Sequence, residues 1–221
     1  MSAGGVLGPV PGIGIMPSVS DQLCPTGVIA SLPDAPLDDH VGVVEVLIQQ
    51  GLTGFVLPAS CEAFADVVAI FGARAVFGAT RVVDADGVRL AAERGARFVL
   101  ADVASEEVAF AAQEEGLPCH GSAMTPTEVR AALALPDGRA LLYPADVTGH
   151  SMASRLAELG LIDRVVALGG IGAYAAGEWL KAGAQAVGVE STLLGDAYSG
   201  GSLGQLRDRC ASFVAVNKRG D

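Results

Sequence analysis

The stretch "RFVLADVASEEVAFAAQEEGLPCHG" (97–121) decides the fold. An apolar run over 97–102 is followed by an alanine-rich segment of helical period over 105–115, and a second apolar run begins after Gly116. Ser105 stands where a helix N-cap is expected, and Gly116 stands where helices commonly end in a left-handed residue. The stretch therefore predicts a strand, a helix and the next strand.

The same unit repeats along the chain. Helical segments end in "QQG", "ERG", "EEG", "ELG" and "KAG", each followed by an apolar run. Helix caps are also expected at Asp84 and at Thr125, which precedes a proline. Strands are predicted over 27–32, 54–59, 74–79, 97–102, 117–121, 139–145, 164–170 and 184–190. Helices are predicted over 38–50, 61–71, 84–94, 105–115, 125–134, 150–159, 172–182 and 203–217.

Eight alternating strands and helices predict an α/β fold, a single-domain (β/α)₈ TIM barrel over 26–221. An irregular N-terminal arm is predicted over 1–25, because proline and glycine interrupt its apolar residues. The competing fold is an open doubly wound sheet, whose dinucleotide fingerprint GxGxxG follows the first strand. Here the glycines of "GPVPGIG" (8–14) precede that strand, which favours the barrel.

Composition narrows the classes of partner. Hydrophobic residues make up 51% of the chain and charged residues 18%, which suits a parallel sheet buried on both faces. The net charge of −11, without a run of Lys or Arg, disfavours nucleic acid and anionic membrane surfaces as partners. No apolar run approaches 18 residues, so no membrane span is expected. A small anionic metabolite held by backbone N–H groups remains the expected partner.

A cytoplasmic location is expected from two further features. The four cysteines (24, 61, 119 and 210) are scattered without a CxxC pair, as expected of reduced thiols. The first twenty residues lack the positively charged start of a signal peptide.

In a (β/α)₈ barrel the active site lies at the C-terminal ends of the strands. Paired glycines in "LGGIGAY" (168–174) expose backbone N–H groups at a helix start, and "GVESTLLG" (188–195) adds hydroxyl groups from the next loop. This is the usual phosphate position of such barrels. Gly169, Gly170 and Thr192 are therefore the candidate phosphate ligands, although the glycines could also simply form a tight turn.

Ionisable side chains also gather at the predicted rim. Asp102, Asp146 and Glu190 follow strands four, six and eight, and His120 and His150 are expected at the same end. Carboxylates and imidazoles in one pocket suit acid/base catalysis, although each alone is more often a cap or a solvated loop residue. No HxH or HExxH spacing is present. No cofactor is therefore certain, and a divalent metal ion remains open.

Five short motifs carry a resemblance that extends over about residues 27–217. They are "GARFVLAD" (95–102), "GSAMTPTEV" (121–129), "LLYPAD" (141–146), "LGGIGA" (168–173) and "GVESTLL" (188–194). As a set they resemble the 2-dehydro-3-deoxy-phosphogluconate (4-hydroxy-2-oxoglutarate) aldolases. The resemblance implies a (β/α)₈ barrel, a homotrimer, and cleavage of a 2-oxo acid to pyruvate and an aldehyde.

The sequence departs from the family at the family's catalytic positions. The family's Schiff-base lysine, three residues before the proline of strand six, falls at Leu141. Its general acid/base glutamate falls at Val56, and the arginine that holds the pyruvate carboxylate falls at Ser60. Lys181 and Lys218 are the only lysines, and both are expected near the ends of helices that descend from the rim, so they lie toward the opposite face. The sequence therefore predicts no Schiff-base aldolase.

The resemblance is better preserved on the phosphate side. Gly169 and Gly170 match the family's glycines, and Thr192 falls where the family has serine. The family's threonine of strand three falls at Thr80 or Arg81, which makes Arg81 a further candidate for substrate binding.

The loss of the family's catalytic residues and the preservation of its phosphate-side residues leave two functions open. The first is an aldolase-like lyase acting on a small phosphorylated or carboxylated oxo acid or sugar derivative. Asp146, His120, Asp102 and His150 would then transfer protons, and Gly169, Gly170, Thr192, Arg81 and Ser60 would bind substrate. The alternative is a non-catalytic barrel that serves as a binding or assembly subunit.

Overall fold

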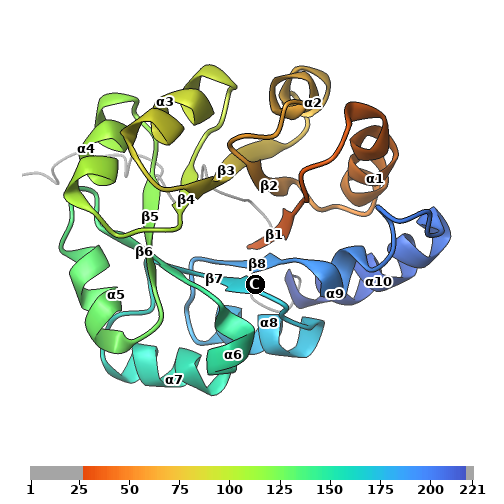
Figure 1. Cartoon of the computed structure of the whole chain (residues 1–221). Coiled ribbons are helices and arrows are strands. Elements are labelled where there is room, and N and C mark those ends of the chain that lie inside the picture. Colours follow the sequence, from red (N-terminus) through yellow and green to blue (C-terminus); the bar gives the residue numbers. More distant parts are fainter. Residues whose placement is uncertain (1–26, 218–221) are drawn as a thin grey trace, which may run out of the picture.

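Eight parallel strands close into a barrel in which β8 pairs with β1 (Figure 1). The structure is a computed structural model that describes residues 27–217. The predicted (β/α)₈ barrel is confirmed, and the predicted arm over 1–25 lies outside the described residues. The strands are β1 (Val28–Ser31), β2 (Gly54–Pro58), β3 (Val76–Val82), β4 (Val99–Ala101), β5 (Cys119–Ala123), β6 (Arg139–Leu142), β7 (Val165–Gly169) and β8 (Ala186–Val189).

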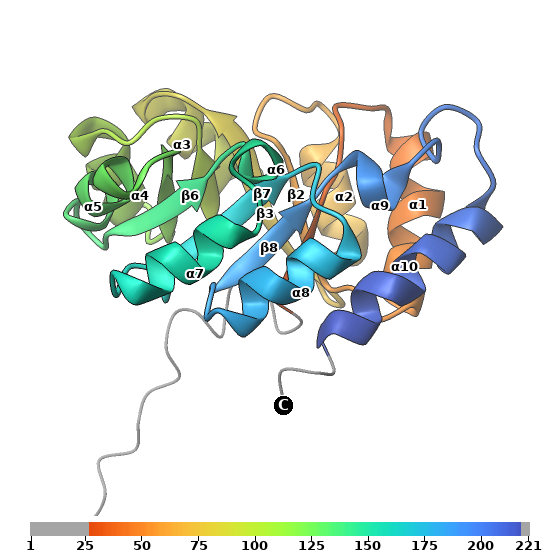
Figure 2. The ribbon, with the colours of Figure 1, turned by 90° about the horizontal axis from the view of Figure 1, so that it is seen from below.

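Helices surround the barrel and return the chain from the end of one strand to the start of the next (Figure 1). The long helices are α1 (Leu37–Gln49), α2 (Phe64–Phe71), α3 (Ala85–Glu93), α4 (Glu106–Glu114), α5 (Pro126–Leu133), α7 (Ser151–Glu158), α8 (Ala173–Lys181) and α10 (Leu203–Asn217). Two short helices, α6 (Ala145–Thr148) and α9 (Ser191–Leu194), were not predicted. They lie at the end of the barrel toward which the strands point (Figure 2).

The predicted helix caps are confirmed. Asp84 accepts a hydrogen bond from the N–H of Gly87, and Ser105 accepts one from Val108. Thr125 forms a capping box with Glu128. The glycines of the five predicted helix ends all have positive φ angles, namely Gly51, Gly95, Gly116, Gly160 and Gly183. Local sequence therefore fixes these boundaries.

Two apolar clusters hold the fold together. The larger one lies between the strands and the helices. The smaller one draws on strands or the residues next to them, without a helix residue, and so fills the inside of the barrel. Its buried members are Ile29, Val56, Phe98, Leu100, Leu141, Val166, Leu168 and Ala186. Both faces of the sheet are thus covered, as the apolar composition requires.

Strand boundaries differ from the prediction by up to three residues, most notably in β3, which runs to Val82 instead of residue 79, and in β5 and β6. β5 begins at Cys119 instead of residue 117, and β6 ends at Leu142 instead of residue 145 because α6 starts immediately beyond Pro144. The difference in β5 moves His120 toward the start of its strand. Cys61, Cys119 and Cys210 are free thiols, and the structure describes no helix long and apolar enough to cross a membrane.

Candidate functional site

A cavity of about 440 Å³ lies at the C-terminal ends of the strands. Leu100 and Leu168 of the inner cluster contribute apolar lining, and polar residues contributed by several strands complete it. The polar lining includes Thr80, Arg81, Asp102, Tyr143, Glu190 and Tyr198. Pockets of this size commonly hold a small metabolite.

Arg81 joins two strands at the edge of the cavity. Its Nη1 donates to Oδ2 of Asp102 over 3.5 Å, and its Nη2 donates to the hydroxyl oxygen of Tyr143 over 3.4 Å. Its φ angle of 59° lies in the left-handed region, which costs a non-glycine residue about 1–2 kcal/mol. Such backbone geometry is concentrated at functional sites. The Arg81 side chain is 52% exposed, so it can still pair with a ligand anion.

Glu190 follows β8 and stands at the N-cap of α9. Burial raises the pKa of its carboxyl, the positive charge of Arg81 acts in the opposite direction, and Asp146 adds to the rise. A carboxylate with a raised pKa is a stronger base than an ordinary glutamate. Glu190 is therefore the best-placed proton acceptor among the described lining residues.

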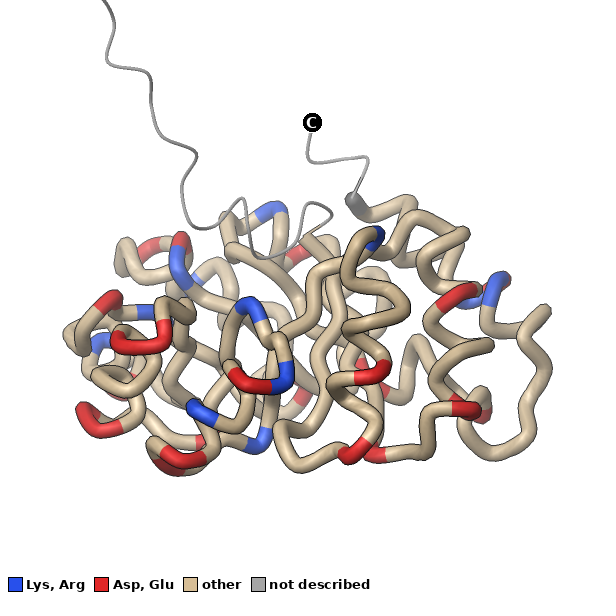
Figure 3. The backbone as a smooth tube through the Cα atoms, turned by 90° about the horizontal axis from the view of Figure 1, so that it is seen from above, with Lys and Arg blue, Asp and Glu red and all other residues tan. Residues whose placement is uncertain are grey.

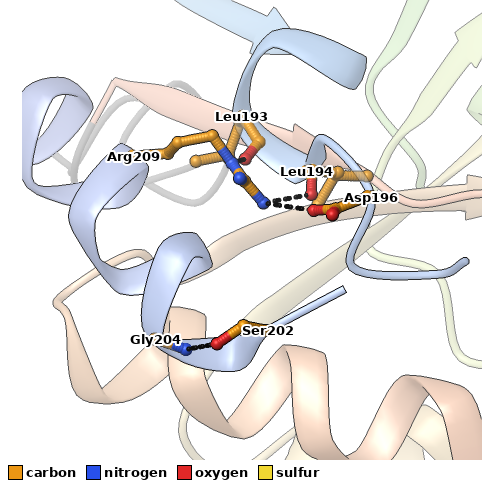
Figure 4. A network of polar contacts seen from close by, with 6 residues as sticks. All are labelled: Leu193, Leu194, Asp196, Ser202, Gly204 and Arg209. Atoms are coloured by element: carbon orange, nitrogen blue, oxygen red, sulfur yellow. Dashed lines mark hydrogen bonds and ion pairs between the residues drawn. The ribbon is translucent and has the colours of Figure 1, made fainter. Parts of the chain in front are cut away.

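The wall formed by α9 is fastened to α10 by Arg209 (Figure 4). The Arg209 side chain donates to the carbonyl oxygens of Leu193 and Leu194 over 2.9 and 2.7 Å, and lies 3.5 Å from Oδ1 of Asp196. These bonds satisfy carbonyls at the end of a short helix. Farther along the same wall, the Tyr198 hydroxyl lies 2.8 Å from Nδ1 of the buried His40.

The predicted phosphate ligands lie beside the cavity, in contacts with other protein groups. The N–H of Gly170 donates to Oδ1 of Asp146 over 3.1 Å. The hydroxyl of Thr192 donates to the carbonyl oxygen of Ile171 over 2.7 Å. Asp146 itself is exposed in the first turn of α6. Gly169, Gly170, Thr192 and Asp146 are thus brought together around one loop.

The two histidines expected at the rim lie elsewhere. His120 is the second residue of β5, pairs in register with Arg139 at the start of β6, and is fully buried. Its Nε2 lies 3.0 Å from Oε1 of Gln185, which directly precedes β8, so the ring lies near the N-terminal end of the barrel. Burial lowers its pKa to about 4. His150 is exposed before α7, where its ring contacts the edge of Tyr174.

The positions where the resemblance implies the lysine and glutamate lie inside the barrel. Leu141 and Val56 belong to the same inner apolar cluster and are 1% and 0% exposed. Neither contributes to the lining of the cavity. Ser60, where the resemblance implies an arginine, is exposed in the turn after β2 and is also absent from the lining.

Acidic residues dominate the charge of the cavity. Asp34, Asp102 and Glu190 line it together with Arg81. In the backbone view, Asp and Glu positions intermingle with Lys and Arg positions around the barrel (Figure 3). Within residues 27–217, no three His, Cys, Asp or Glu side chains are grouped so that they could hold a metal ion. Among the described residues, the cavity therefore offers no cluster of three such side chains as ligands for a divalent ion.

From the sequence, Glu190 is expected at the rim but is not among the predicted catalytic residues, and no role is predicted for Tyr143. Tyr143 lies two residues beyond Leu141, and Glu190 lies two residues beyond Gly188. Because side chains alternate between the two faces of a strand, both continue the inward-facing series of their strands. This spacing is the signal that could have selected them.

Comparisons with known proteins agree with this fold. The model of the family "KDPG and KHG aldolase" matches residues 19–200. A native KDPGal structure is 23% identical with a TM-score of 0.76, covering 87% of this chain and 95% of that one. A 4-hydroxy-2-oxoglutarate/2-dehydro-3-deoxyphosphogluconate aldolase is 25% identical with a TM-score of 0.75, covering 92% and 99%.

A more distant aldolase shares the fold as well. The KDPG aldolase from Legionella pneumophila, captured with pyruvate as a covalent carbinolamine, is 18% identical with a TM-score of 0.73, covering 90% of this chain and 98% of that one. No curated protein matches the chain. The family match spans most of the sequence and includes all eight strands. The chain therefore belongs to the KDPG and KHG aldolase family.

Proposed function

We propose that the protein is an aldolase-like lyase that cleaves a small 2-oxo acid bearing a carboxylate, by acid/base chemistry without a Schiff base. One observation carries this proposal. Arg81, held by Asp102 and Tyr143, lines the same cavity as Glu190, at the end of the barrel where such enzymes act. A cation and a strengthened base in one pocket are the minimum that this chemistry requires.

Arg81 is the proposed anchor for the substrate. Its planar guanidinium offers several N–H donors, which suit the carboxylate and the neighbouring carbonyl oxygen of a 2-oxo acid. The Tyr143 hydroxyl lies beside the same guanidinium and can donate to the carbonyl oxygen. Together they would stabilise the negative charge that develops on that oxygen during cleavage.

Glu190 is the proposed proton carrier. It would accept the proton of the substrate hydroxyl while the adjacent carbon–carbon bond breaks and the aldehyde forms. The electron pair of that bond passes to the 2-oxo group and gives an enolate, held by Arg81 and Tyr143. Return of the proton from Glu190 to the enolate carbon gives pyruvate and restores the base. Asp102 keeps Arg81 in position and does not touch the substrate.

The inner cluster supports a route without an imine. Leu141 and Val56 are apolar and buried, and an imine requires a lysine amine. Lys181 is exposed at the end of α8, where it faces Glu178 over 3.9 Å. The proposed enzyme therefore depends on polar donors in place of the iminium ion.

Pyruvate release tests the proposal. Purified protein is incubated with 2-oxo-4-hydroxy acids, and pyruvate is measured by NADH oxidation through lactate dehydrogenase. We expect turnover by the wild type and its loss in Arg81→Met and Glu190→Gln. Borohydride should trap no covalent adduct between the wild-type protein and its substrate, because no imine forms. Arg89→Met is the matched control, because Arg89 pairs with Asp86 on the outside of α3. Turnover that survives in both site variants would contradict the proposal.

A second function remains in competition because of the inner cluster. Its apolar residues occupy both positions where the resemblance implies catalytic groups, which favours a barrel retained for binding or assembly. Absence of turnover together with a stable oligomer in sedimentation experiments would favour this function. A homotrimer is proposed for either case from the family resemblance.

A further inference from the structure

The cavity has an apolar wall on the side away from Arg81 and Asp102. Leu32 follows β1, whereas Leu194 and Tyr198 lie within and after α9, which follows β8. Because β1 pairs with β8 in the closed barrel, these three residues line the same side of the cavity. Arg81 and Asp102 belong to the ends of β3 and β4, on another part of the ring. Leu32 and Leu194 are 3% and 6% exposed, so their contact surface is available mainly to a molecule inside the cavity.

Tyr198 is fixed in this wall by His40 of α1. The tyrosine hydroxyl lies 2.8 Å from Nδ1 of His40, and the two rings meet edge to face with centroids 5.3 Å apart. His40 is fully buried, and burial lowers its pKa, so the imidazole is neutral at neutral pH. A buried hydrogen bond between neutral groups gives the tyrosine ring one orientation. His40 does not line the cavity itself.

The same wall has a second anchor. Arg209 of α10 donates to the carbonyl oxygens of Leu193 and Leu194 over 2.9 and 2.7 Å (Figure 4). The segment from Leu194 to Tyr198 is therefore held from outside by two different helices, α10 and α1. A surface fixed before binding takes up a ligand with little loss of conformational freedom. Such a surface can discriminate between ligand groups by their shape and polarity.

The cavity is larger than the part of the substrate assigned to Arg81. Its volume of about 440 Å³ leaves room beyond a pyruvate unit, toward the wall that contains Tyr198. Of the polar residues on that side, Asp34 and Ser191 are exposed and Ser31 is half-buried. Asp34 and Ser191 can therefore keep water as a partner when a ligand covers the wall. Apolar atoms placed against the wall leave water, which is favourable in proportion to the area buried.

We propose that Tyr198 determines substrate specificity by forming, with Leu32 and Leu194, the binding surface for an apolar alkyl or aryl tail of the 2-oxo acid. His40 is its positioning residue, because it holds the ring without touching the substrate. The inference rests on the proposed function, in which Arg81 holds the other end of the substrate. Cleavage would then release pyruvate and an apolar aldehyde.

Two uncleavable acids test the wall without any turnover. 2-Oxo-4-phenylbutanoate and 2-oxobutanoate differ only in the phenyl group, and neither carries the hydroxyl that cleavage requires. Calorimetry gives the Kd of each for the wild type, Tyr198→Ala and Tyr198→Phe. We expect the wild type to bind the phenyl acid about tenfold to a hundredfold more tightly, and Tyr198→Ala to lose about tenfold of this preference. Tyr198→Phe keeps the ring and should keep most of the preference. The ratio of the two Kd values does not change if part of a variant is unfolded, because both acids bind the same folded fraction.

The matched control is Tyr174→Ala. Tyr174 is 72% exposed on α8, and its ring meets the edge of His150 with centroids 5.4 Å apart, so the variant removes a similar pair outside the cavity. Its Kd ratio should equal that of the wild type. Equal affinity of the wild type for both acids would overturn the proposal. So would an equal loss of preference in Tyr198→Ala and Tyr174→Ala, or a loss in Tyr198→Phe as large as that in Tyr198→Ala.

Two further measurements separate this inference from the proposed function. Arg81→Met should weaken both acids by the same factor, because the anchor is common to them. In turnover, 2-oxo-4-hydroxy-4-phenylbutanoate should show a higher kcat/KM than 2-oxo-4-hydroxypentanoate, and Tyr198→Ala should reduce that ratio about tenfold. Failure to cleave either acid would count against the lyase, while the Kd ratios would still decide the role of Tyr198. Absence of binding by both uncleavable acids would overturn the Arg81 anchor and the apolar wall together.

Discussion

Arg81 and Tyr143 contact each other across the mouth of the barrel, although 62 positions separate them in the sequence. The guanidinium carbon lies 5.5 Å from the centre of the tyrosine ring, while Nη2 reaches the hydroxyl oxygen over 3.4 Å. The Arg81 side chain is thus held by Tyr143, which follows β6, and by Asp102, which follows β4. A pre-positioned cation of this kind binds an anion with little loss of conformational freedom.

Replacing Arg81 by Lys should reduce kcat/KM for a 2-oxo acid by about 10²-fold or more. Lysine retains the charge but lacks the planar fork that can hold a carboxylate and a carbonyl oxygen together, and loss of one such donor costs about 10²–10³ in rate. Steady-state kinetics measure the effect. Arg89→Lys, on the outer surface of α3, should leave the rate unchanged. A full rate in Arg81→Lys would remove Arg81 from the binding site.

Replacing Glu190 by Gln should change stability in a pH-dependent manner. The pKa of Glu190 is raised in the folded protein, so the unfolded chain releases its proton at lower pH than the folded chain does. The charged carboxyl therefore costs stability once the pH rises through the folded pKa, and that cost is absent below the unfolded pKa. We expect Glu190→Gln to raise Tm at neutral pH and to have little effect in acid.

Thermal unfolding at a series of pH values measures this difference, with Glu93→Gln on α3 as control. A Glu190→Gln variant that is less stable than the wild type at neutral pH would contradict the burial cost. In the kinetic assay the same variant should also lose the rise of rate with pH, because the proposed proton acceptor has been removed.

The sequence could predict the repeat but not every side-chain direction. The βα units depend on local signals, such as the Ser105 cap and the Gly116 turn, and these signals act within a few residues. The direction of His120 depends on where β5 begins relative to β4 and β6. A shift of two residues along the strand moves that ring from the rim toward the opposite end.

The contacts between cavity residues could not be predicted from local sequence signals, for a different reason. Arg81 meets Tyr143 only because the barrel closes and brings β3 and β6 to face each other across one rim. The contact between Asp146 and Gly170 similarly requires α6, which starts directly after Pro144. Such contacts depend on tertiary geometry. The sequence alone could therefore identify the individual residues, but it could not predict which of them contact each other.

Replacing His120 by Asn should reduce the loss of stability in acid. Burial lowers the pKa of His120 from 6.5 to about 4, and Arg139 contributes in the same direction. Between these values the unfolded chain binds a proton that the folded chain does not, so wild-type stability falls as the pH falls through this interval. At about 1.4 kcal/mol per pH unit, the interval corresponds to about 3 kcal/mol.

Denaturant unfolding between pH 4 and pH 7 measures the slope. The exposed His150 is the matched control, and His150→Asn should reproduce the wild-type slope. An unchanged slope in His120→Asn would show that His120 is not the titrating group. Turnover of His120→Asn should persist, because the residue does not line the cavity.

Replacing Leu141 by Lys should allow pyruvate to be trapped as a covalent adduct. Leu141 is 1% exposed and belongs to the inner cluster, together with Leu168, which lines the cavity. A lysine side chain is long enough to extend from this strand toward the cavity, and burial lowers the pKa of its amine so that more of it is neutral and nucleophilic. Attack on the carbonyl carbon of pyruvate, with loss of water, gives an imine that borohydride reduces to a stable amine. Intact-mass spectrometry then detects the adduct.

The Leu141→Lys variant should lose about 3 kcal/mol or more in free energy of unfolding, because an unpaired amine enters an apolar cluster. The matched control is Ala134→Lys at the exposed end of α5, where no adduct is expected. A folded Leu141→Lys that yields no adduct would show that the apolar residue at this position is not what prevents imine formation.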